Sequence, residues 1–348
     1  MNVSNFLGWD IGGAHLKIAT ISNNGKILSV TQYPTPLWEG LSVLEDALIG
    51  AVKKIPVKGQ SHAITMTAEL ADIFQDRQEG VNSIIGLCHK ILGTNISFYT
   101  MNYGLKKINI KKLDFNQIAS ANWHASSTYT ASLVESGLFI DVGSTTTDII
   151  PFYGNKIRSR GINDQSRLRF DELIYMGVVR TPIMALTSKV IFNGKLQNII
   201  NENFATTADV YRILGYLNEF DDLMETADGE DKSISSSIRR LARILGTDSI
   251  INNNENNWQE LAKYIHEIQL EIITNSIKKV LSTLPKRRHL LVCAGVGNFL
   301  VKIISQRLNI DCINFSELLD CDISFKQNSN VCAPAVSIAH LNRLSQIK

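Results

Sequence analysis

The stretch Gly8–Lys17 reads GWDIGGAHLK, and the stretch Phe139–Asp148 reads FIDVGSTTTD. Each is an apolar run that ends in an aspartate, Asp10 or Asp141, and continues through a glycine turn into small, hydroxyl-bearing or cationic residues. A carboxylate at the end of a buried strand is costly unless a cation or a donor meets it, and glycines let a phosphate reach backbone N–H groups. The repeat therefore predicts two phosphate-binding hairpins that face one cleft.

The composition is that of an ordinary globular protein. The chain has 348 residues, of which 44% are hydrophobic and 20% charged, so it is long enough for two lobes. A formal net charge of +2 gives no broad basic surface, and nucleic acid is not expected as a partner. Five cysteines without a CxxC pair indicate reduced thiols and a cytoplasmic protein. No run of about 18 apolar residues occurs, so no membrane span is expected.

The first part of the chain alternates apolar runs with turns. Three runs joined by tight turns, one of them Asn-Asn-Gly at 23–25, predict an antiparallel meander. Apolar residues at helical spacing predict the helices that follow it. The expected order is strands 6–10, 16–22 and 27–33, helix 40–52, strand 61–67, helix 81–92 and strand 96–100.

The second part restarts this order and then departs from it. Strands are expected over 138–142 and 147–152, with a hairpin turn at 153–156. Further helices are expected over 171–186, 209–217, 233–245, 258–284 and 333–344, and a strand over 290–293. We predict an N-terminal lobe of residues 1–132 and a C-terminal lobe of residues 133–348. The second lobe carries a largely helical elaboration at about 158–237 and a glycine turn at 294–298.

Two Asp-Gly hairpins, each opening a meander, and a late strand ending in Ala294-Gly295-Val296-Gly297 resemble the actin, Hsp70 and sugar-kinase superfamily. The resemblance implies a two-lobed α/β fold, a duplicated ribonuclease H-like unit around a central cleft. In that superfamily the hairpins bracket the phosphates of a ligand. The last glycine turn lies near a nucleotide base there, which makes Gly295 and Gly297 candidate residues on the nucleotide or substrate side.

Shorter phrases look like the hydantoinase/oxoprolinase-related proteins of the tetrahydromethanopterin-linked one-carbon pathway. Archaeal members join an (aminomethyl)furanmethyl diphosphate to the phenol of γ-glutamyltyramine and release diphosphate, as a step of methanofuran biosynthesis. Trp9 and His15 look more like the methylotrophic bacterial branch, in which the carrier is methylofuran. The resemblance implies a cytoplasmic transferase, open to being a homodimer, with a diphosphate and a phenol (γ-glutamyltyramine or tyramine) as substrates. The phrases are Thr67-Ala68-Glu69-Leu70, Asn122-Trp123-His124, Arg180-Thr181-Pro182 and Cys332-Ala333-Pro334-Ala335.

A departing diphosphate needs neutralisation, and this need implies roles for the two turns. Asp10 and Asp141 are the expected anchors for Mg²⁺, because a hard cation prefers oxygen ligands and shared phosphate oxygens. Asp148 is a further metal candidate, unless it interacts with a nearby backbone turn. Lys17 is alternatively an outward strand residue, and Arg180 a solvated one. The expected phosphate contacts are Gly12, Gly13, His15, Lys17, Gly143, Ser144, Thr145, Thr146 and Arg180.

A phenol must lose its proton as it attacks, so a general base is expected. Glu69 is the first candidate, and its alternative is an acid at a helix start that interacts only with the helix dipole. Trp123, beside Asn122, could stack on a substrate ring, and His124 could shuttle a proton. The alternative for this segment is a core anchor beside a hydrogen-bonded polar residue.

Two other functions suit the same pattern. An ATP-dependent small-molecule kinase or ligase would place adenosine on the turn at Gly295 and Gly297 and a triphosphate on the hairpins. A non-catalytic sensor would use the clamp without turnover. The fold alone does not choose among the three.

Overall fold

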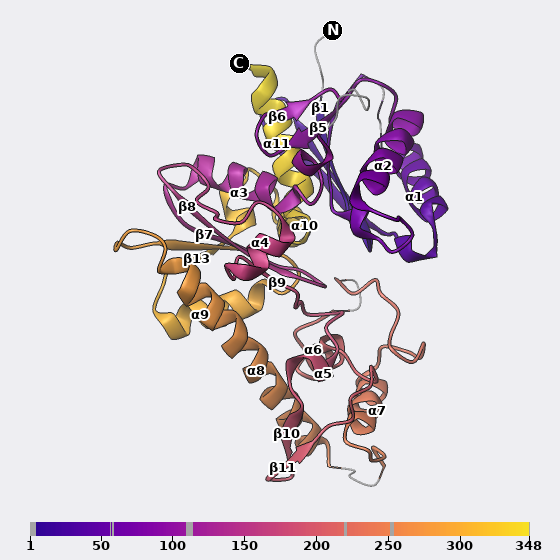
Figure 1. Cartoon of the computed structure of the whole chain (residues 1–348), viewed down its shortest axis with the longest axis vertical. Helices are drawn as coiled ribbons and strands as arrows, with labels where there is room; N and C mark the ends of the chain where they lie inside the picture. Colours follow the sequence, from indigo (N-terminus) through magenta and orange to yellow (C-terminus); the bar gives the residue numbers. More distant parts are fainter. Residues whose placement is uncertain are drawn as a thin grey trace. The chain divides into compact units, whose positions relative to one another are not determined.

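The computed structural model describes residues 5–55, 57, 59–108, 114–218, 221–250 and 254–347. The chain forms two compact units, each assembled from separate stretches of sequence (Figure 1). Unit 1 comprises Met1–Phe139, Ile150–Ser159 and Ile313–Lys348, and unit 2 comprises Ile140–Ile149 and Arg160–Cys312. The chain therefore passes between the units more than once.

Unit 1 is built on a six-stranded sheet with the strand order β3-β2-β1-β4-β5-β6. Its first three strands form the predicted antiparallel meander, which is confirmed. The strand β4 pairs in parallel with β1, β5 pairs in parallel with β4, and β6 is antiparallel to β5. The strands are β1 Asn5–Ile11, β2 His15–Ser22, β3 Ile27–Pro34, β4 Ser61–Met66, β5 Ile96–Thr100 and β6 Gly104–Lys106.

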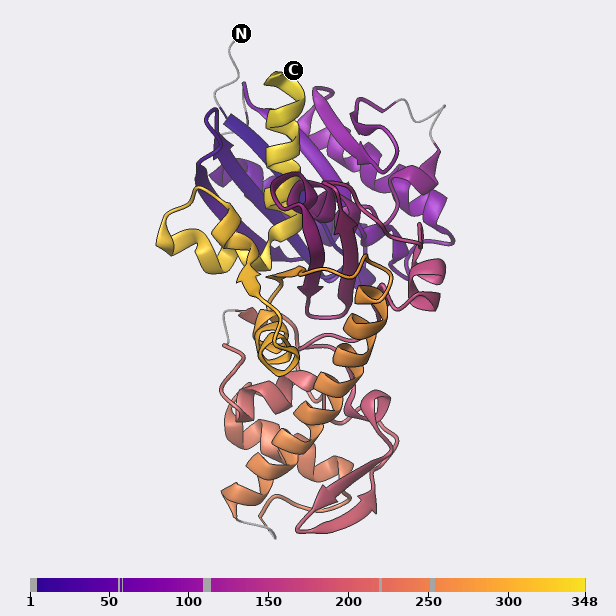
Figure 2. The same ribbon diagram turned by 90° about the vertical axis from the view of Figure 1, so that its left-hand side faces the viewer.

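Helices cover both faces of this sheet, which is why β1 is buried along almost its whole length. On one face Trp9 and its neighbours pack with α1 and α2 in an apolar core. On the other face α11 runs along β1 (Figure 2). A Cβ on Gly8 would lie 2.0 Å from the Ala335 carbonyl oxygen, so only glycine allows this close approach. The helices of unit 1 are α1 Leu41–Lys54, α2 Arg77–Leu92, α3 Asn122–Leu133, α10 Ile323–Val331 and α11 Ala333–Ile347.

The compact units differ from the predicted lobes, because residues 133–139, 150–159 and 313–348 belong to unit 1, and the last helix is the clearest case. The lobe of residues 133–348 was expected to contain α11. In the structure α11 packs on β1, β4 and α3 and is part of unit 1. The packing of Gly8 against this helix, more than 300 residues away in sequence, is a long-range feature without a local signal.

The second sheet has the order β13-β12-β7-β8-β9, and the division between the units runs through β7 and β8. The predicted turn after β8 is confirmed, since the Tyr153 N–H donates to the Lys156 carbonyl at 2.9 Å. Its central residues Gly154 and Asn155 have φ values of 61° and 57°, as a two-residue hairpin turn requires. The strands are β7 Ser136–Val142, β8 Thr147–Tyr153, β9 Leu173–Ile174, β12 Leu290–Ala294 and β13 Cys312–Asn314.

One predicted helix of the elaboration is wrong. The range 171–186 contains the short strand β9 and a single helical turn at its end. Asp171 has a left-handed φ of 58°, and Pro182 lacks an N–H, so neither continues a helix. The elements of the elaboration and of the rest of unit 2 are α4 Asp164–Arg169, α5 Ile183–Leu186, β10 Lys189–Phe192, β11 Lys195–Asn198, α6 Thr207–Ile213, α7 Ile234–Ile244, α8 Glu255–Leu281 and α9 Asn298–Leu308.

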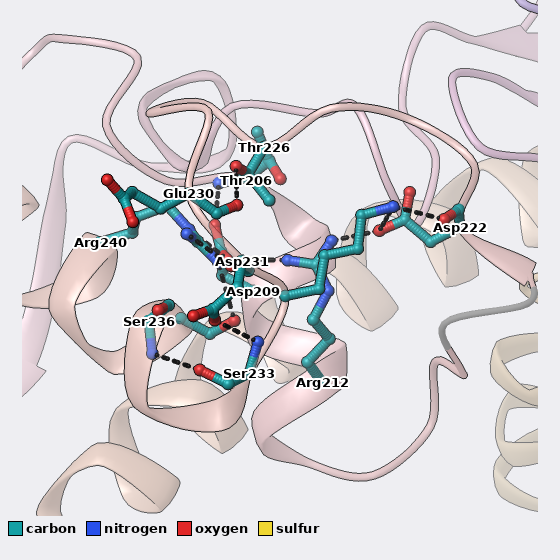
Figure 3. A network of polar contacts seen from close by, with 12 residues as sticks. Thr206, Asp209, Arg212, Asp222, Thr226, Glu230, Asp231, Ser233, Ser236 and Arg240 are labelled. Carbon is teal, nitrogen blue, oxygen red and sulfur yellow. Dashed lines mark hydrogen bonds and ion pairs between the residues drawn. The ribbon is translucent and has the colours of Figure 1, made fainter.

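Buried charges hold α6, α7 and the acidic loop before α7, residues 221–231, together (Figure 3). The Arg240 side chain is fully buried, and its Nε donates to Asp209 Oδ1 at 2.7 Å. Arg212 donates to the same carboxylate at 3.1 Å and also pairs with Asp222. Asp228 in the acidic loop accepts from Arg240 Nη1 at 2.9 Å. The acidic loop thus neutralises guanidinium groups that α6 and α7 bury.

None of the five cysteines forms a disulfide in the structure. Within the described ranges, no helix is both long enough and apolar enough to span a bilayer.

Candidate active site

The first glycine turn joins β1 and β2 in unit 1. Asp10, at the end of β1, is 4% exposed and lies between its register partners Lys17 on β2 and Thr65 on β4. The Gly12 N–H donates to the His15 carbonyl at 2.9 Å and closes the turn. A Cβ on Gly13 would meet no heavy atom within 4 Å. The turn therefore has an open side beside a buried carboxylate.

The two basic residues predicted to contact phosphate at this turn, His15 and Lys17, lie in different surroundings. His15 is half-buried at the first position of β2. The Lys17 ammonium donates to the Val331 carbonyl at 2.9 Å, at the last residue of α10. Lys17 thus links the sheet to the C-terminal end of a helix, where a cation is favoured by the helix dipole. A phosphate contact by Lys17 stays a prediction.

Glu69 follows β4, on the chain segment that borders the first turn. The Thr67 N–H donates to the Ile11 carbonyl at 2.9 Å, and a Cβ on Gly12 would lie 3.7 Å from Thr67 Oγ1. Glu69 is the middle residue of the single turn Ala68–Leu70 and is only 1% exposed. Its Oε1 accepts a hydrogen bond of 2.8 Å from Ser120 Oγ. The carboxylate is thus buried and oriented, unlike an exposed acid that serves only a helix start.

The segment Asn122–His124 forms the first turn of α3. The Trp123 indole is 3% exposed, which makes it a core anchor, one of the two roles that the sequence left open. The Asn122 Oδ1 accepts from the Trp123 N–H at 2.7 Å. We therefore drop Trp123 as a stacking surface for a substrate ring.

His124 is half-buried and held by a tyrosine from β5. Its Nδ1 lies 2.9 Å from Tyr99 Oη, which also contacts Thr128 Oγ1 at 3.1 Å. Burial raises the pKa of Tyr99 to about 12, so its hydroxyl stays protonated at neutral pH. This hydrogen bond fixes the plane of the imidazole. A role for His124 in proton transfer stays a prediction.

The second glycine turn belongs to unit 2. The Gly143 N–H donates to the Thr146 carbonyl at 2.9 Å, in the same pattern as the first turn. The Gly143 carbonyl accepts from the Val178 N–H at 3.1 Å, and the Ser144 carbonyl accepts from the Arg180 N–H at 2.9 Å. The backbone of Arg180 is therefore bonded to the turn, and its side chain is exposed. Ser144 and Arg180, both predicted as phosphate contacts, are thus joined through their backbones.

Three further glycines, Gly177, Gly295 and Gly297, pack against this turn or the strand that leads into it. A Cβ on Gly177 would lie 2.4 Å from the Ser144 carbonyl, and a Cβ on Gly295 would lie 2.4 Å from Asp141 Oδ1. The Gly297 N–H donates to the Val142 carbonyl at 2.8 Å. The late glycine turn thus lies directly on the strand end that carries Asp141. The sequence indicated Gly295 and Gly297 but gave no sign of Gly177.

Asp148 has a structural partner. Its carboxylate accepts from Arg167 Nη2, and the side chains are 14% and 2% exposed. Burial raises the pKa of Asp148, and the Arg167 guanidinium opposes this rise. A carboxylate already paired with a buried guanidinium has little left to offer a metal. We drop Asp148 from the metal candidates.

Asp10 and Asp141 remain as candidate ligands of a divalent ion. Within the described ranges, no three His, Cys, Asp or Glu side chains cluster as metal ligands. Each unit instead offers one strand-end carboxylate, Asp10 or Asp141, next to a glycine turn. Mg²⁺ commonly takes one or two carboxylates, with substrate phosphates and water completing its shell. The donor set fits this pattern and does not fit an all-protein cage.

Sequence comparisons relate the chain to one family. The model of the family described as hydantoinase/oxoprolinase matches residues 60–321. A protein of Methanocaldococcus jannaschii named (4-{4-[2-(gamma-L-glutamylamino)ethyl]phenoxymethyl}furan-2-yl)methanamine synthase is 32% identical over 339 residues, covering 96% of each chain. A protein of Methanococcus vannielii with the same name is 32% identical over 166 residues, covering 47% of this chain and 72% of its own.

Solved structures show the fold. The nucleotide-free structure of an acetone carboxylase matches with a TM-score of 0.59 and 9% identity, over 96% of this chain and 70% of that chain. A ROK family glucokinase from Streptomyces griseus, solved with glucose and AMPPNP, matches with a TM-score of 0.50 and 12% identity. The match covers 97% of this chain and 99% of the glucokinase chain. The predicted α/β fold of the sugar-kinase type is confirmed.

Proposed function

The chain belongs to the hydantoinase/oxoprolinase family, and from this premise we propose that it is the synthase that forms the aryl ether of a methanofuran-type cofactor. The observation that carries the proposal is the 32% identity to the M. jannaschii synthase over nearly the whole of both chains. The name of that relative describes a product in which a phenoxy oxygen is bonded to a methyl carbon on furan. The proposed substrates of this chain are an (aminomethyl)furanmethyl diphosphate and γ-glutamyltyramine.

The reaction balances as a substitution at carbon. The phenol oxygen bonds to the furanmethyl carbon while the bond from that carbon to the diphosphate oxygen breaks, and its electron pair leaves with diphosphate. The furan ring stabilises positive charge on the carbon during this exchange. The phenol proton goes to a base and then to solvent. The protein must therefore bind a polyanion, hold an aromatic alcohol and accept one proton.

Glu69 is proposed as the base. Its carboxylate is buried and oriented by Ser120, and it follows Thr67, which borders the first glycine turn. A base near a leaving diphosphate takes the proton only if it is held in the right geometry. His124, oriented by Tyr99, is proposed to relay the proton. Asn122, at the start of the same helix, is proposed to contact substrate.

The two turns are proposed to bind the diphosphate, each within its own unit. Gly12 and Gly13 leave an open side on the first turn, and Ser144 to Thr146 bring hydroxyls to the second. Arg180, anchored to Ser144 by its backbone, is proposed to add positive charge. Asp10 in unit 1 and Asp141 in unit 2 would each offer a carboxylate to Mg²⁺, which would supply positive charge to the leaving group.

The test is to incubate the protein with the furanmethyl diphosphate, γ-glutamyltyramine and MgCl₂, and to measure the ether by mass spectrometry and diphosphate by a coupled assay. We expect one diphosphate to be released per ether formed. A parallel reaction uses tyramine in place of γ-glutamyltyramine as the acceptor. The variant Glu69→Gln should lower the rate of ether formation by roughly 100-fold or more, whereas Glu255→Gln, at an exposed carboxylate on α8, should keep the wild-type rate. ADP formation that depends on substrate and ATP, without ether, would contradict the proposal.

A further inference from the structure

Ser120 adopts a backbone conformation that serine rarely takes. Its φ is 50°, in the left-handed region where glycine, and to a lesser extent asparagine, is favoured. The residue is 6% exposed and lies between the turn Phe115–Gln117 and the start of α3. Such conformations persist only where surrounding contacts impose them, and they are frequent at functional sites.

The usual reasons for a serine at a helix start do not apply here. The N-cap of α3 is Ala121, with no side-chain capping hydrogen bond. The Ser120 hydroxyl instead donates to Glu69 Oε1 at 2.8 Å, across 51 positions of sequence. Glycine would satisfy the backbone without strain but would have no hydroxyl. The side chain is therefore explained by the carboxylate that it contacts.

We propose that Ser120 is a positioning residue that holds the Glu69 carboxylate in its orientation for accepting the phenol proton. This inference rests on the proposed function. The left-handed backbone aims the hydroxyl at a side chain that is only 1% exposed, so the Glu69 carboxylate is constrained by the segment that precedes α3. A second constraint comes from α2, because a Cβ on Gly80 would lie 2.6 Å from the Glu69 carbonyl oxygen. Both the backbone and the carboxylate of this residue are thus fixed.

The pair Ser120→Ala and Ser120→Gly separates the hydroxyl from the backbone. Both variants lose the hydroxyl, but only glycine relieves the strained φ. We expect both to lower kcat by roughly 10- to 100-fold with little change in KM, as for misplacement of a reacting group. Their melting temperatures should differ, with Ser120→Gly the higher by about 2 °C.

The pH profile gives a readout that stability alone does not move. A hydroxyl that donates to a carboxylate stabilises its charged form. Loss of the hydroxyl should therefore move the acid limb of the kcat profile to higher pH in both variants. The matched control is Ser127→Ala, a buried serine of α3 whose hydroxyl donates to the Trp123 carbonyl at 2.7 Å. It should leave the profile in place.

The outcomes are distinguishable. In a Glu69→Gln background, Ser120→Gly should cause no further loss of kcat, because both changes remove the same contribution. Wild-type kcat and an unmoved profile in Ser120→Gly, in a protein that forms the ether, would overturn the inference and leave the function standing. Absence of ether from the wild-type protein would overturn the function, and the inference with it.

Discussion

The Cα of Gly295 lies against the carboxylate of Asp141, so closely that a Cβ there would be 2.4 Å from Asp141 Oδ1 and 2.2 Å from the Val142 carbonyl oxygen. Gly295 also has a left-handed φ of 82°. Position 295 therefore requires glycine for two reasons: the left-handed backbone, and the lack of space for a Cβ beside Asp141. It follows that the late glycine turn sets the position of the Asp141 carboxylate.

Gly295→Ala should be strongly destabilising and should abolish ether formation, because the backbone contact cannot give way. The matched control is Gly194→Ala, which has a similar φ of 72° but no heavy atom within 4 Å of the added Cβ. The control should cost about 1 kcal/mol, the strain of the φ alone. Gly295→Ala should cost at least about 2 kcal/mol more. Denaturant unfolding measures both, and equal costs would show that the contact with Asp141 is unimportant.

Asp10→Asn and Asp141→Asn should each lower ether formation by roughly 100-fold or more, if each carboxylate contributes to neutralising the diphosphate through Mg²⁺. The exposed Asp46→Asn on α1 makes the same change of charge and should keep full activity. Steady-state rates over a MgCl₂ titration measure this. Folded Asp10→Asn protein with wild-type rates and an unchanged Mg²⁺ requirement would exclude Asp10 as an anchor.

Asp148 and Arg167 are expected to act as a structural pair. Arg167→Met should cost about 3–5 kcal/mol, because it leaves a buried carboxylate without its cation, and Asp148→Asn in the same protein should recover part of this. Burial raises the pKa of Asp148 above its usual 3.8, and removal of Arg167 adds to that rise. The folded form of Arg167→Met then binds the proton more tightly than the unfolded form. The free energy of unfolding of Arg167→Met should therefore fall as pH rises from 3.8 to the raised pKa of Asp148.

Denaturant unfolding at several pH values tests the Asp148–Arg167 pair. The Mg²⁺ dependence of ether formation tests whether Asp148 binds a metal. Asp148→Asn should keep the Mg²⁺ dependence of ether formation, since its carboxylate is engaged by Arg167. A raised Mg²⁺ requirement in Asp148→Asn would return this residue to the metal site.

His340 is expected to make the protein sensitive to acid. Burial, helped by the charge of Arg343, lowers its pKa from 6.5 to about 4, and its ring stacks on Tyr129 at 4.6 Å. Between these two values the unfolded chain binds a proton that the folded chain does not. Stability should therefore fall as pH is lowered from 6.5 to 4, by about 3 kcal/mol from this group.

The variant His340→Phe keeps a stacking ring and removes the titrating group. Its free energy of unfolding should change less with pH over the interval from 6.5 to 4 than that of the wild type. Equal slopes in wild type and His340→Phe would contradict this account.

Local patterns predicted the fold and the positions of the turns, because the evidence for them lies within a few residues. The strand, aspartate and glycine turn at Asp10 and at Asp141 are contiguous in sequence, and so is the hairpin turn at Gly154. The helix expected over 171–186 is wrong because the left-handed turn at Asp171 and the break at Pro182 interrupt this segment.

Contacts between distant residues were not predictable in this way. Ser120 and Glu69 are 51 positions apart, and Gly177 meets Ser144 only through the folded chain. The roles of Lys17 and Asp148 depended on partners, Val331 and Arg167, that no spacing identifies. The facing arrangement of the two glycine turns, and binding of Mg²⁺, stay predictions.

The central claim is that a phenol oxygen displaces diphosphate at carbon. The most direct measurement uses γ-glutamyltyramine labelled with ¹⁸O at the phenol, with the furanmethyl diphosphate and MgCl₂, followed by mass spectrometry of both products. The account predicts that all of the label is retained in the ether and that the released diphosphate carries none. Label in the phosphate product, or phosphorylated tyramine in place of an ether when ATP is supplied, would contradict it.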